Sequence, residues 1–191
     1  MRIIGGDAAG RLLKVPDGLG VRPMPDKVKL AVFNSLGGFV EGTRVLDLFA
    51  GTGALGQECL SRGAVSVLSV EKSSRHARFY RDNLSSSGLD SSRVELRVMD
   101  VFTALPQLAA TDRRFELVIA DPPYGEKNVG RRSSSLAQRL LDETHLPGLI
   151  MPDGLFIIGH TRRDTLEIPG HWKERRMLKH GDTVIRILGV T

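Results

Sequence analysis

The strongest constraint on the fold is an alternation of apolar strand-like runs with helical runs, which begins near residue 43. Strand-like runs rich in Val, Ile and Leu predict buried strands, and the segments between them carry an apolar face at helical spacing. Continuous apolar strands separated by helices indicate a parallel sheet that is covered on both faces. We expect strands at about 44–48, 65–70, 94–98, 115–120 and 154–158, with helices ending near 62 and spanning about 74–86 and 134–146.

The end of the chain departs from this alternation. Two strand-like runs, 172–179 and 184–190, are joined by His180-Gly181-Asp182-Thr183. A short turn that contains glycine is typical of a β-hairpin, so the last strand should be antiparallel. An α/β chain with a mostly parallel, seven-stranded sheet and an antiparallel terminal hairpin resembles the class I methyltransferase (Rossmann-like) fold more than a dinucleotide-binding Rossmann fold.

The first 30 residues differ in character from the rest, because basic residues alternate there with frequent glycine and proline. Ile3-Ile4 and the run 12–15 are expected to form two short strands of a small hairpin. A helix should follow from about Asp26 to Leu36, with Asp26 as its N-cap. We therefore divide the chain into a basic N-terminal extension, residues 1–30, and a catalytic domain, residues 31–191.

The overall composition limits the possible partners and setting. A chain of 191 residues suits one domain, and its net charge of +5 favours an anionic partner such as a nucleic acid. The single cysteine, Cys59, allows no intrachain disulfide and is expected to be a buried packing residue. The histidines show no metal-ligand spacing, so we expect no metal. No signal peptide or spanning segment is evident, and a cytoplasmic monomer is expected.

A glycine-rich turn follows the first predicted strand. Gly51-x-Gly53-x-x-Gly56 satisfies the dinucleotide-binding fingerprint, but the same turn would let a backbone approach the methionine part of S-adenosylmethionine. Asp47 favours the second interpretation, because it fits the Asp-x-Phe-x-Gly-x-Gly pattern of methyltransferases that act on amino groups. A carboxylate there would repel a pyrophosphate and suit a cationic amino-acid moiety. The alternative is an Asp that only caps the loop.

Acidic residues close four successive predicted strands: Asp47, Glu71, Asp100 and Asp121. Ligands of open α/β sheets bind at the carboxyl ends of strands, so these acids define one predicted site. Glu71 is expected to accept hydrogen bonds from the ribose hydroxyls and Asp100 to accept one from the adenine amine, unless Asp100 is only a helix N-cap. The predicted cofactor-binding residues are Asp47, Phe49, Ala50, Gly51, Thr52, Gly53, Glu71, Lys72, Asp100, Val101 and Asp121.

The fourth predicted strand runs into Asp121-Pro122-Pro123-Tyr124, which we predict to be the catalytic motif. The amine of a nucleic-acid base is a poor nucleophile, and the Asp121 carboxylate and the Pro122 carbonyl could accept its two hydrogens. Consecutive prolines make such a loop stiff, which helps to hold the amine in line with a methyl donor. Tyr124 offers a flat face for a base drawn out of its stack. The alternative is a proline turn in which Tyr124 only packs.

Nearly the whole chain resembles the bacterial small-subunit (16S) ribosomal RNA guanine-N2 methyltransferase family. The resemblance rests on Arg2-Ile3-Ile4-Gly5-Gly6, on Gly10-Arg11 with its basic strand, on Arg22-Pro23 with Phe33-Asn34, and on the run from Asp47 to Gly56. Ser61 to Ala64, Glu71, Asn83, Asp121 to Tyr124 and Gly181-Asp182-Thr183 also fit. It implies S-adenosylmethionine as the cofactor and methylation of a guanine N2 amine in 16S ribosomal RNA, either naked or within a partly assembled small subunit.

The N-terminal extension is where the resemblance implies contact with RNA or with the active-site mouth. Basic residues on a glycine-rich hairpin suit phosphate contacts, and the candidates are Arg2, Arg11, Lys14, Arg22 and Lys27. Two positions depart from the family pattern: Met24 stands where Thr is usual, and Leu30 where Glu is usual. If either residue touches substrate or cofactor, that contact is altered in this chain.

Other functions remain open from the sequence. A DNA adenine or cytosine amino-methyltransferase would use the same tetrapeptide, but it usually needs a separate target-recognition region. A protein-glutamine methyltransferase normally carries Asn where this chain has Asp121. Asp47 and the two prolines disfavour a nicotinamide-dependent oxidoreductase, and the predicted cofactor site disfavours a non-catalytic RNA-binding module.

Overall fold

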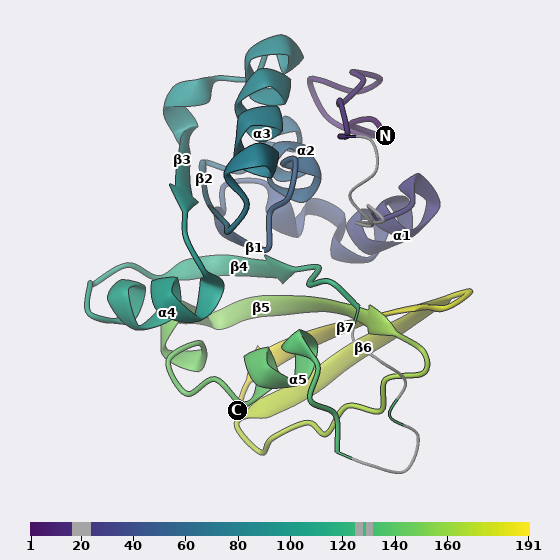
Figure 1. The fold of residues 1–191 in the computed structure, drawn as a ribbon, viewed down its shortest axis with the longest axis vertical. Coiled ribbons are helices and arrows are strands. Elements are labelled where there is room, and N and C mark those ends of the chain that lie inside the picture. The colour runs from purple at the N-terminus through teal and green to yellow at the C-terminus, as the bar shows by residue number, and fades with distance from the viewer. Residues whose placement is uncertain (17–23, 125–127, 129–131) are drawn as a thin grey trace.

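The computed structural model describes residues 1–16, 24–124, 128 and 132–191. Its core is one seven-stranded sheet with the order β3-β2-β1-β4-β5-β7-β6 (Figure 1). The first five strands in the sequence pair in parallel, and β7 pairs antiparallel with both β5 and β6. The strands are β1 (Arg44–Leu48), β2 (Ser66–Glu71), β3 (Val94–Val98), β4 (Phe115–Ala120), β5 (Ile150–Thr161), β6 (Trp172–His180) and β7 (Thr183–Val190).

Five α-helices cover the two faces of the sheet within the described residues. Alternate residues of β1 point to opposite faces: Val45 packs in the hydrophobic cluster of α1, α2 and α3, and Leu46 and Leu48 pack in that of α4 and α5. The central strands of the sheet are therefore buried on both faces, whereas the edge strand β3 is half-buried and the edge strand β6 is largely exposed. The helices are α1 (Asp26–Leu36), α2 (Ala54–Ser61), α3 (Ser74–Ser87), α4 (Val101–Ala109) and α5 (Leu136–Leu141), with short 3-10 turns at Gly37–Val40, Ser91–Arg93 and Pro147–Leu149.

The predicted fold class is confirmed by this topology. Because β1, β2, β3, β4 and β5 are parallel, their carboxyl ends meet at one edge of the sheet. The β6–β7 hairpin brings His180 and Thr183 to the same edge, since Thr161 at the end of β5 lies opposite Thr183. This shared edge, called the catalytic edge below, is where all four acidic residues end up.

Side-chain caps explain where α3 and α5 begin. Ser73 accepts a hydrogen bond from the His76 N–H at 3.3 Å at the start of α3, and Ser135 does the same for Gln138 at 3.2 Å at the start of α5. The expected cap at Asp26 is wrong: Pro25 is the N-cap of α1, and Asp26 is the first helical residue. Its carboxylate is drawn instead toward the Arg2 guanidinium, at 3.5 Å.

Four other elements differ from the sequence prediction. The predicted helix over 134–146 is a single short helix, α5, and β5 begins at Ile150, four residues before the predicted start at 154. Helix α4 was not predicted, although Asp100 is its N-cap and accepts the Phe102 N–H at 2.9 Å. The N-terminal hairpin is reduced to one isolated antiparallel bridge between Arg2 and Leu12, because glycine-rich turns occupy most of the segment.

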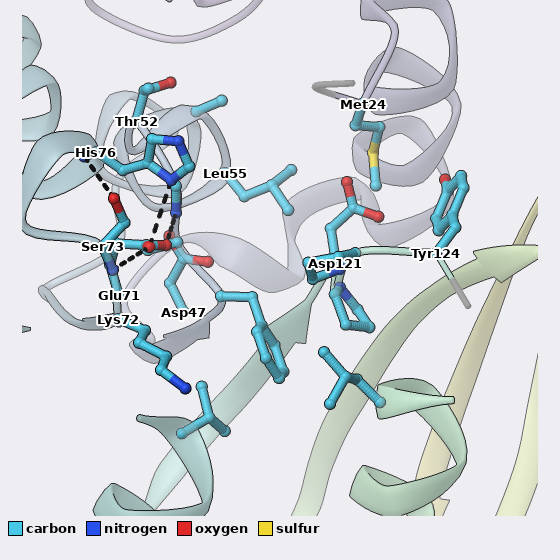
Figure 2. A pocket seen from close by; sticks show the side chains of 18 of the residues that line it. Met24, Asp47, Thr52, Leu55, Glu71, Lys72, Ser73, His76, Asp121 and Tyr124 are labelled. Carbon is cyan, nitrogen blue, oxygen red and sulfur yellow. Dashed lines mark hydrogen bonds and ion pairs between the residues drawn. The ribbon is translucent and has the colours of Figure 1, made fainter. Parts of the chain in front are cut away.

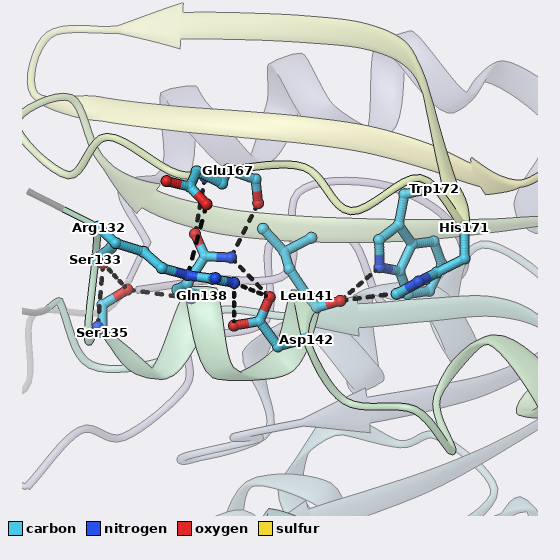
Figure 3. A network of polar contacts seen from close by, with 9 residues as sticks. All are labelled: Arg132, Ser133, Ser135, Gln138, Leu141, Asp142, Glu167, His171 and Trp172. Atoms are coloured by element: carbon cyan, nitrogen blue, oxygen red, sulfur yellow. Dashed lines mark hydrogen bonds and ion pairs between the residues drawn. The ribbon is translucent and has the colours of Figure 1, made fainter.

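A polar network holds α5 against the connection between β5 and β6 (Figure 3). The Gln138 amide donates to the Glu167 carbonyl at 2.9 Å and accepts the Glu167 N–H at 2.8 Å. Trp172, at the start of β6, donates its indole N–H to the Leu141 carbonyl at 2.9 Å. Satisfying these buried groups fixes the chain that follows the catalytic motif onto the body of the sheet.

The N-terminal segment is docked on α2 through a buried carboxylate. Glu58 accepts the Ile4 N–H at 2.8 Å and the Gly5 N–H at 2.9 Å, and it forms ion pairs with Lys29 at 3.3 Å and Arg62 at 2.8 Å. The side chains of Lys29 and Glu58 are fully buried. The proposed division at residue 30 falls inside α1, so the extension and the domain share a helix and a charge cluster.

Candidate active site

A cavity of about 740 Å³ opens at the catalytic edge of the sheet (Figure 2). This volume lies within the range of small-molecule and cofactor sites. The ends of β1, β2, β4 and the start of α4 contribute most of its wall. It is lined by ten of the predicted cofactor-binding residues, namely Asp47, Phe49, Ala50, Gly51, Thr52, Glu71, Lys72, Asp100, Val101 and Asp121, and by Pro122, Pro123 and Tyr124.

The glycine turn between β1 and α2 has a conformation that few residues can adopt. Gly51 and Gly53 have φ values of 57° and 88°, and Phe49, a residue with a Cβ, has a φ of 58°. A side chain in the left-handed region costs about 1–3 kcal/mol, and such strain is concentrated at functional sites. Gly53, the remaining predicted cofactor residue, is buried as the N-cap of α2 and does not line the cavity.

Asp47 lies at the end of β1, where one carboxylate oxygen bonds to α2 and the other has no hydrogen-bond partner among the described residues. Its Oδ2 accepts the Gly56 N–H at 3.0 Å, and a Cβ on Gly56 would stand 2.8 Å from the same oxygen. Its Oδ1 is buried with no hydrogen-bond partner in the described part of the chain. Burial raises the pKa of Asp47 to about 7, and the neighbouring Glu71 and Asp121 add to that rise. A buried oxygen of this kind is suited to a cationic ligand.

Glu71, at the end of β2, ties the glycine turn to the next loop. Its Oε2 accepts the Gly51 N–H at 2.7 Å, and its Oε1 accepts the Ser73 N–H at 2.7 Å. The His76 Nδ1 stands 3.4 Å from Oε1 (Figure 2). Oε2 keeps a second lone pair, whereas Oε1 is already approached by both Ser73 and His76, so one of the two predicted ribose contacts can form without displacing a neighbour. The structure thus gives Glu71 a role in shaping the turn that the sequence did not indicate.

Asp100 is the N-cap of α4, and it also lines the cavity, where its contact with an adenine amine remains a prediction. Its Oδ1 caps α4, and its Oδ2 pairs with the Lys72 ammonium at 3.2 Å. The carboxylate is half-buried and lines the cavity beside an aromatic wall, where Phe102 packs edge-to-face on Phe49 with ring centroids 6.3 Å apart. The Arg139 guanidinium lies 3.8 Å above the Phe102 ring. This part of the cavity therefore offers an acceptor next to flat apolar surfaces, as a purine ring requires.

Asp121 follows β4 and is enclosed by its neighbours. Its Oδ1 is buried without a partner among the described residues, and a Cβ on Gly159 of β5 would stand only 2.5 Å from that oxygen. Burial raises the pKa of Asp121 to about 7. A carboxylate held this way is a hydrogen-bond acceptor with nothing to accept from in the described residues, which is the arrangement that a substrate amine would complete.

Tyr124 lines the cavity beside Asp121, from the same loop (Figure 2). Its side chain is 42% exposed, which is unusual for a large aromatic residue, and its hydroxyl donates to Thr183 Oγ1 at 3.3 Å. The contact places the ring beside the β6–β7 hairpin. An exposed ring fixed at its polar end can present its face to a planar group.

The predicted RNA-binding residues divide into three groups. Arg2 and Lys14 are exposed and adjoin Met1 and Val15, which line the cavity. Arg11 and Lys27 are exposed but do not line it. Arg22 lies outside the described residues. The role of all five in RNA binding remains a prediction, and among them Arg2 forms an ion pair with Asp26.

Several residues that line the cavity were missed by the sequence reasoning. Met1, Val15, Pro16 and Met24 reach it from the N-terminal segment. Met24, one of the two departures from the family pattern, is buried there near Tyr124 (Figure 2), whereas Leu30 is 44% exposed on α1 and away from the cavity. Only the basic N-terminal extension hinted at such contacts. The other cavity-lining residues that the sequence reasoning missed are Ala54, Leu55, Ser73, His76, Phe102, Leu136 and Arg139.

Two absences concern the described residues alone. They contain no group of three or more His, Cys, Asp or Glu side chains that could hold a metal ion. None of their helices has the length and apolar character needed to cross a membrane. Cys59 is fully buried on α2, and burial raises its thiol pKa well above the usual value, as suits a packing residue.

A family model described as "Conserved hypothetical protein 95" matches residues 1–189. This chain belongs to that family. Among its relatives, the "Putative rRNA methyltransferase YlbH" of Bacillus subtilis is 34% identical over 88% of this chain and 86% of its own length. The "Ribosomal RNA small subunit methyltransferase D" of Escherichia coli is 36% identical, over 65% of this chain and 60% of its own length.

The fold is also found in solved structures. The structure of a hypothetical protein of Thermus thermophilus superimposes with a TM-score of 0.82 at 29% identity, and the match covers 100% of this chain and 99% of that one. The resemblance to small-subunit ribosomal RNA methyltransferases that the sequence motifs indicated is confirmed at the level of the family. It extends over the N-terminal segment as well as the sheet.

Proposed function

We propose that this chain transfers the methyl group of S-adenosylmethionine to the exocyclic N2 amine of a guanine in small-subunit (16S) ribosomal RNA. The observation that carries the proposal is Asp121, which lines the cavity at the end of β4 together with Asp47 and whose buried Oδ1 has no partner among the described residues. One acceptor suits the substrate amine and the other suits a cationic cofactor. Their presence in one cavity is what an amine methyltransferase needs.

The residues of the cavity fit S-adenosylmethionine. Asp47, with its unused Oδ1, would hold the ammonium of the methionine part, and the positive-φ glycine turn lets the backbone come close. Glu71 and Asp100 would bind the ribose and the adenine amine, and Phe102 would lie against the purine ring. The bound cofactor supplies an electrophilic methyl group on a cationic sulfur.

The catalytic loop would then act on the target amine. Asp121 and the Pro122 carbonyl accept its two hydrogens, which orients the nitrogen lone pair toward the methyl group. The nitrogen that receives the methyl group supplied by the cofactor would become cationic and would have to lose a proton. Asp121, whose pKa burial raises to about 7, is suited to take the proton that the nitrogen then loses. Tyr124 stacks on the flipped guanine.

The choice of RNA rests on charge and on the relatives. The chain carries a net charge of +5, and exposed Arg2, Arg11, Lys14 and Lys27 belong to the segment that forms one wall of the cavity mouth. The relatives named above carry names of rRNA methyltransferases. A guanine N2 target, a partly assembled small subunit as the substrate and a monomeric enzyme are proposals taken from the family resemblance.

The test compares ribosomal RNA from a strain that lacks the gene with RNA from its parent. Nuclease digestion and mass spectrometry should show one N2-methylguanosine missing from the small-subunit RNA of the deletion strain. Purified protein with S-adenosylmethionine should restore it on naked RNA or on isolated subunits, and the two reactions identify the preferred substrate. Methyl incorporation into DNA and not into RNA would contradict the proposal.

A further inference from the structure

Asn83 of α3 has no part in the mechanism above, yet it is fully buried and its side chain makes three hydrogen bonds. Its Oδ1 accepts the Lys14 N–H at 2.7 Å, and its Nδ2 donates to the Lys14 carbonyl at 3.0 Å. The same Nδ2 donates to the Thr52 carbonyl at 3.0 Å. A single amide group therefore joins the N-terminal segment to the glycine turn.

Both partners of Asn83 are next to the cavity. Thr52 lines it from the glycine turn, and Val15 and Pro16, which follow Lys14, line it from the N-terminal segment. The segment is anchored a second time, independently, where Glu58 and Ser61 bind the backbone of residues 4–8. The Asn83 contact is thus the anchor that holds the part of the segment next to the cofactor pocket.

The chemistry of the amide makes this joint specific. The joint needs one acceptor, for the Lys14 N–H, and two donors, for the Lys14 and Thr52 carbonyls. Only the side-chain amide of Asn or Gln supplies an acceptor and two donors on one group. Asp would keep the acceptor and lose both donors. Ala would leave the Lys14 N–H and the Thr52 carbonyl without the partner that this buried contact gives them, which is unfavourable in proportion to their burial.

We propose that Asn83 is a positioning residue that couples RNA binding on the N-terminal segment to cofactor binding at the glycine turn. The proposal rests on the proposed function, because it takes S-adenosylmethionine and RNA as the two ligands. RNA that holds the basic segment in place also holds Val15 and Pro16 over the cavity and the Thr52 carbonyl in the turn. Each ligand then strengthens the binding of the other by the same factor.

The experiment measures the affinity for S-adenosylhomocysteine by calorimetry, with and without a saturating fragment of small-subunit RNA. In the wild type, RNA should tighten binding about tenfold, within the usual range of coupling between sites. In Asn83→Ala the gain should fall to less than about twofold. Trypsin should also cleave the Asn83→Ala variant after Arg11 and Lys14 faster than it cleaves the wild type. Asp82→Ala, at an exposed position one residue earlier on α3, is the matched control and should behave as the wild type.

A second pair of variants tests the same bond from the surface. Lys14→Pro removes the N–H that Asn83 accepts, and Lys14→Gln removes only the charge. Each variant is measured at an RNA concentration that saturates it, because loss of the Lys14 charge should lower the affinity for RNA in both. The first should then lose the RNA-dependent gain and the second should keep it, whether or not Asn83→Ala folds. A full tenfold gain in folded Asn83→Ala or in Lys14→Pro contradicts the coupling, and so does a wild type that shows no gain. A wild type that does not bind S-adenosylhomocysteine at all contradicts the proposed function instead.

Discussion

At the scale of single residues, the site is defined by two buried carboxylates that lack a full set of partners within the described chain. Asp47 and Asp121 each keep one oxygen without a hydrogen bond to the described residues, and burial raises the pKa of each to about 7. Charged groups in such places are unfavourable for folding unless a ligand compensates them. We infer that these two carboxylates lower the stability of the protein without ligands, and that bound ligands supply the missing hydrogen bonds or opposite charge.

The first prediction concerns Asp47→Asn. The pKa of folded Asp47 lies above its unfolded value, so the folded state binds more protons between about pH 4 and 7, and the free energy of unfolding falls as the pH rises through that window. Asparagine removes this dependence. The variant should be more stable than the wild type by about 2–4 kcal/mol at pH 8 and similar at pH 4.

Urea denaturation at the two pH values checks this prediction, and calorimetry with S-adenosylhomocysteine should show weaker binding by the stabilised variant. Asp112→Asn, at an exposed position, is the control and should change neither quantity. If Asp47→Asn lost the same stability at both pH values, Asp47 would have a structural role and its buried charge would not destabilise the protein.

The second prediction concerns Gly159→Ala. A Cβ at this position would lie 2.5 Å from Asp121 Oδ1, so the carboxylate must move. A shift of about 1 Å in a catalytic group can cost about 100-fold in rate, and we expect a loss of methyl transfer of that size with cofactor affinity changed less than about threefold. Steady-state kinetics test it against Gly148→Ala, where an added Cβ meets nothing within 4 Å. Equal activity in the two variants would mean that Asp121 is not held from β5.

At the scale of elements, the sequence predicts best where one rule dominates. The runs at β1 and β4 have the predicted bounds, because a strand buried on both faces is almost continuously apolar. The edge strand β3 also has the predicted bounds, and its apolar residues alternate with Glu95 and Arg97. Helix α4 was missed although Asp100 caps it, because the cap was weighed only as an alternative to cofactor binding. The N-terminal hairpin is only partly formed: residues 1–13 bond across the Arg2–Leu12 bridge. Much of the segment bonds instead to Glu58, Ser61 and Asn83, 50 or more residues away in the sequence.

The third prediction concerns that long-range docking. Glu58→Ala would leave Lys29 buried without its counter-ion and the Ile4 and Gly5 N–H groups without their acceptor. Breaking a buried pair in this way typically costs about 3–5 kcal/mol. We expect a loss of stability of this size in urea denaturation, together with faster proteolysis of residues 1–16. Glu41→Ala, exposed in the loop before β1, is the control. A loss below about 1 kcal/mol would show that the segment is not part of the folded core.

At the scale of the whole molecule, the sequence predicts where the four acidic residues of the site lie. It does not predict the outline of the cavity that they line. Parallel strands bring their carboxyl ends to one edge, so Asp47, Glu71, Asp100 and Asp121 could be placed together from spacing alone. The N-terminal segment lines the same cavity through Val15, Pro16 and Met24. Such contacts join residues far apart in the sequence, so no local sequence pattern predicts them. The charge of the molecule, by contrast, is visible in the composition.

The fourth prediction concerns that charge. If Arg11 and Lys14 contact phosphates, replacing both with Gln should weaken RNA binding and reduce the slope of log affinity against log salt by about 1.4, since each contact contributes about 0.7 for single strands. Fluorescence anisotropy over a salt series measures the slope. The matched control is Lys173→Gln with Arg175→Gln, exposed on β6 toward the end that lies away from the catalytic edge. Equal slopes in the two double variants would place the RNA elsewhere.

The central claim is that the main role of Asp121 is to act on the substrate amine, although the sequence also predicted it among the cofactor-binding residues. The most direct test measures methyl transfer to small-subunit RNA and the affinity for S-adenosylhomocysteine in Asp121→Ala, with Asp112→Ala as the control. We predict that methyl transfer falls by about 1,000-fold or more while the affinity stays within about threefold. Turnover near that of the wild type in a folded Asp121→Ala variant would contradict the account.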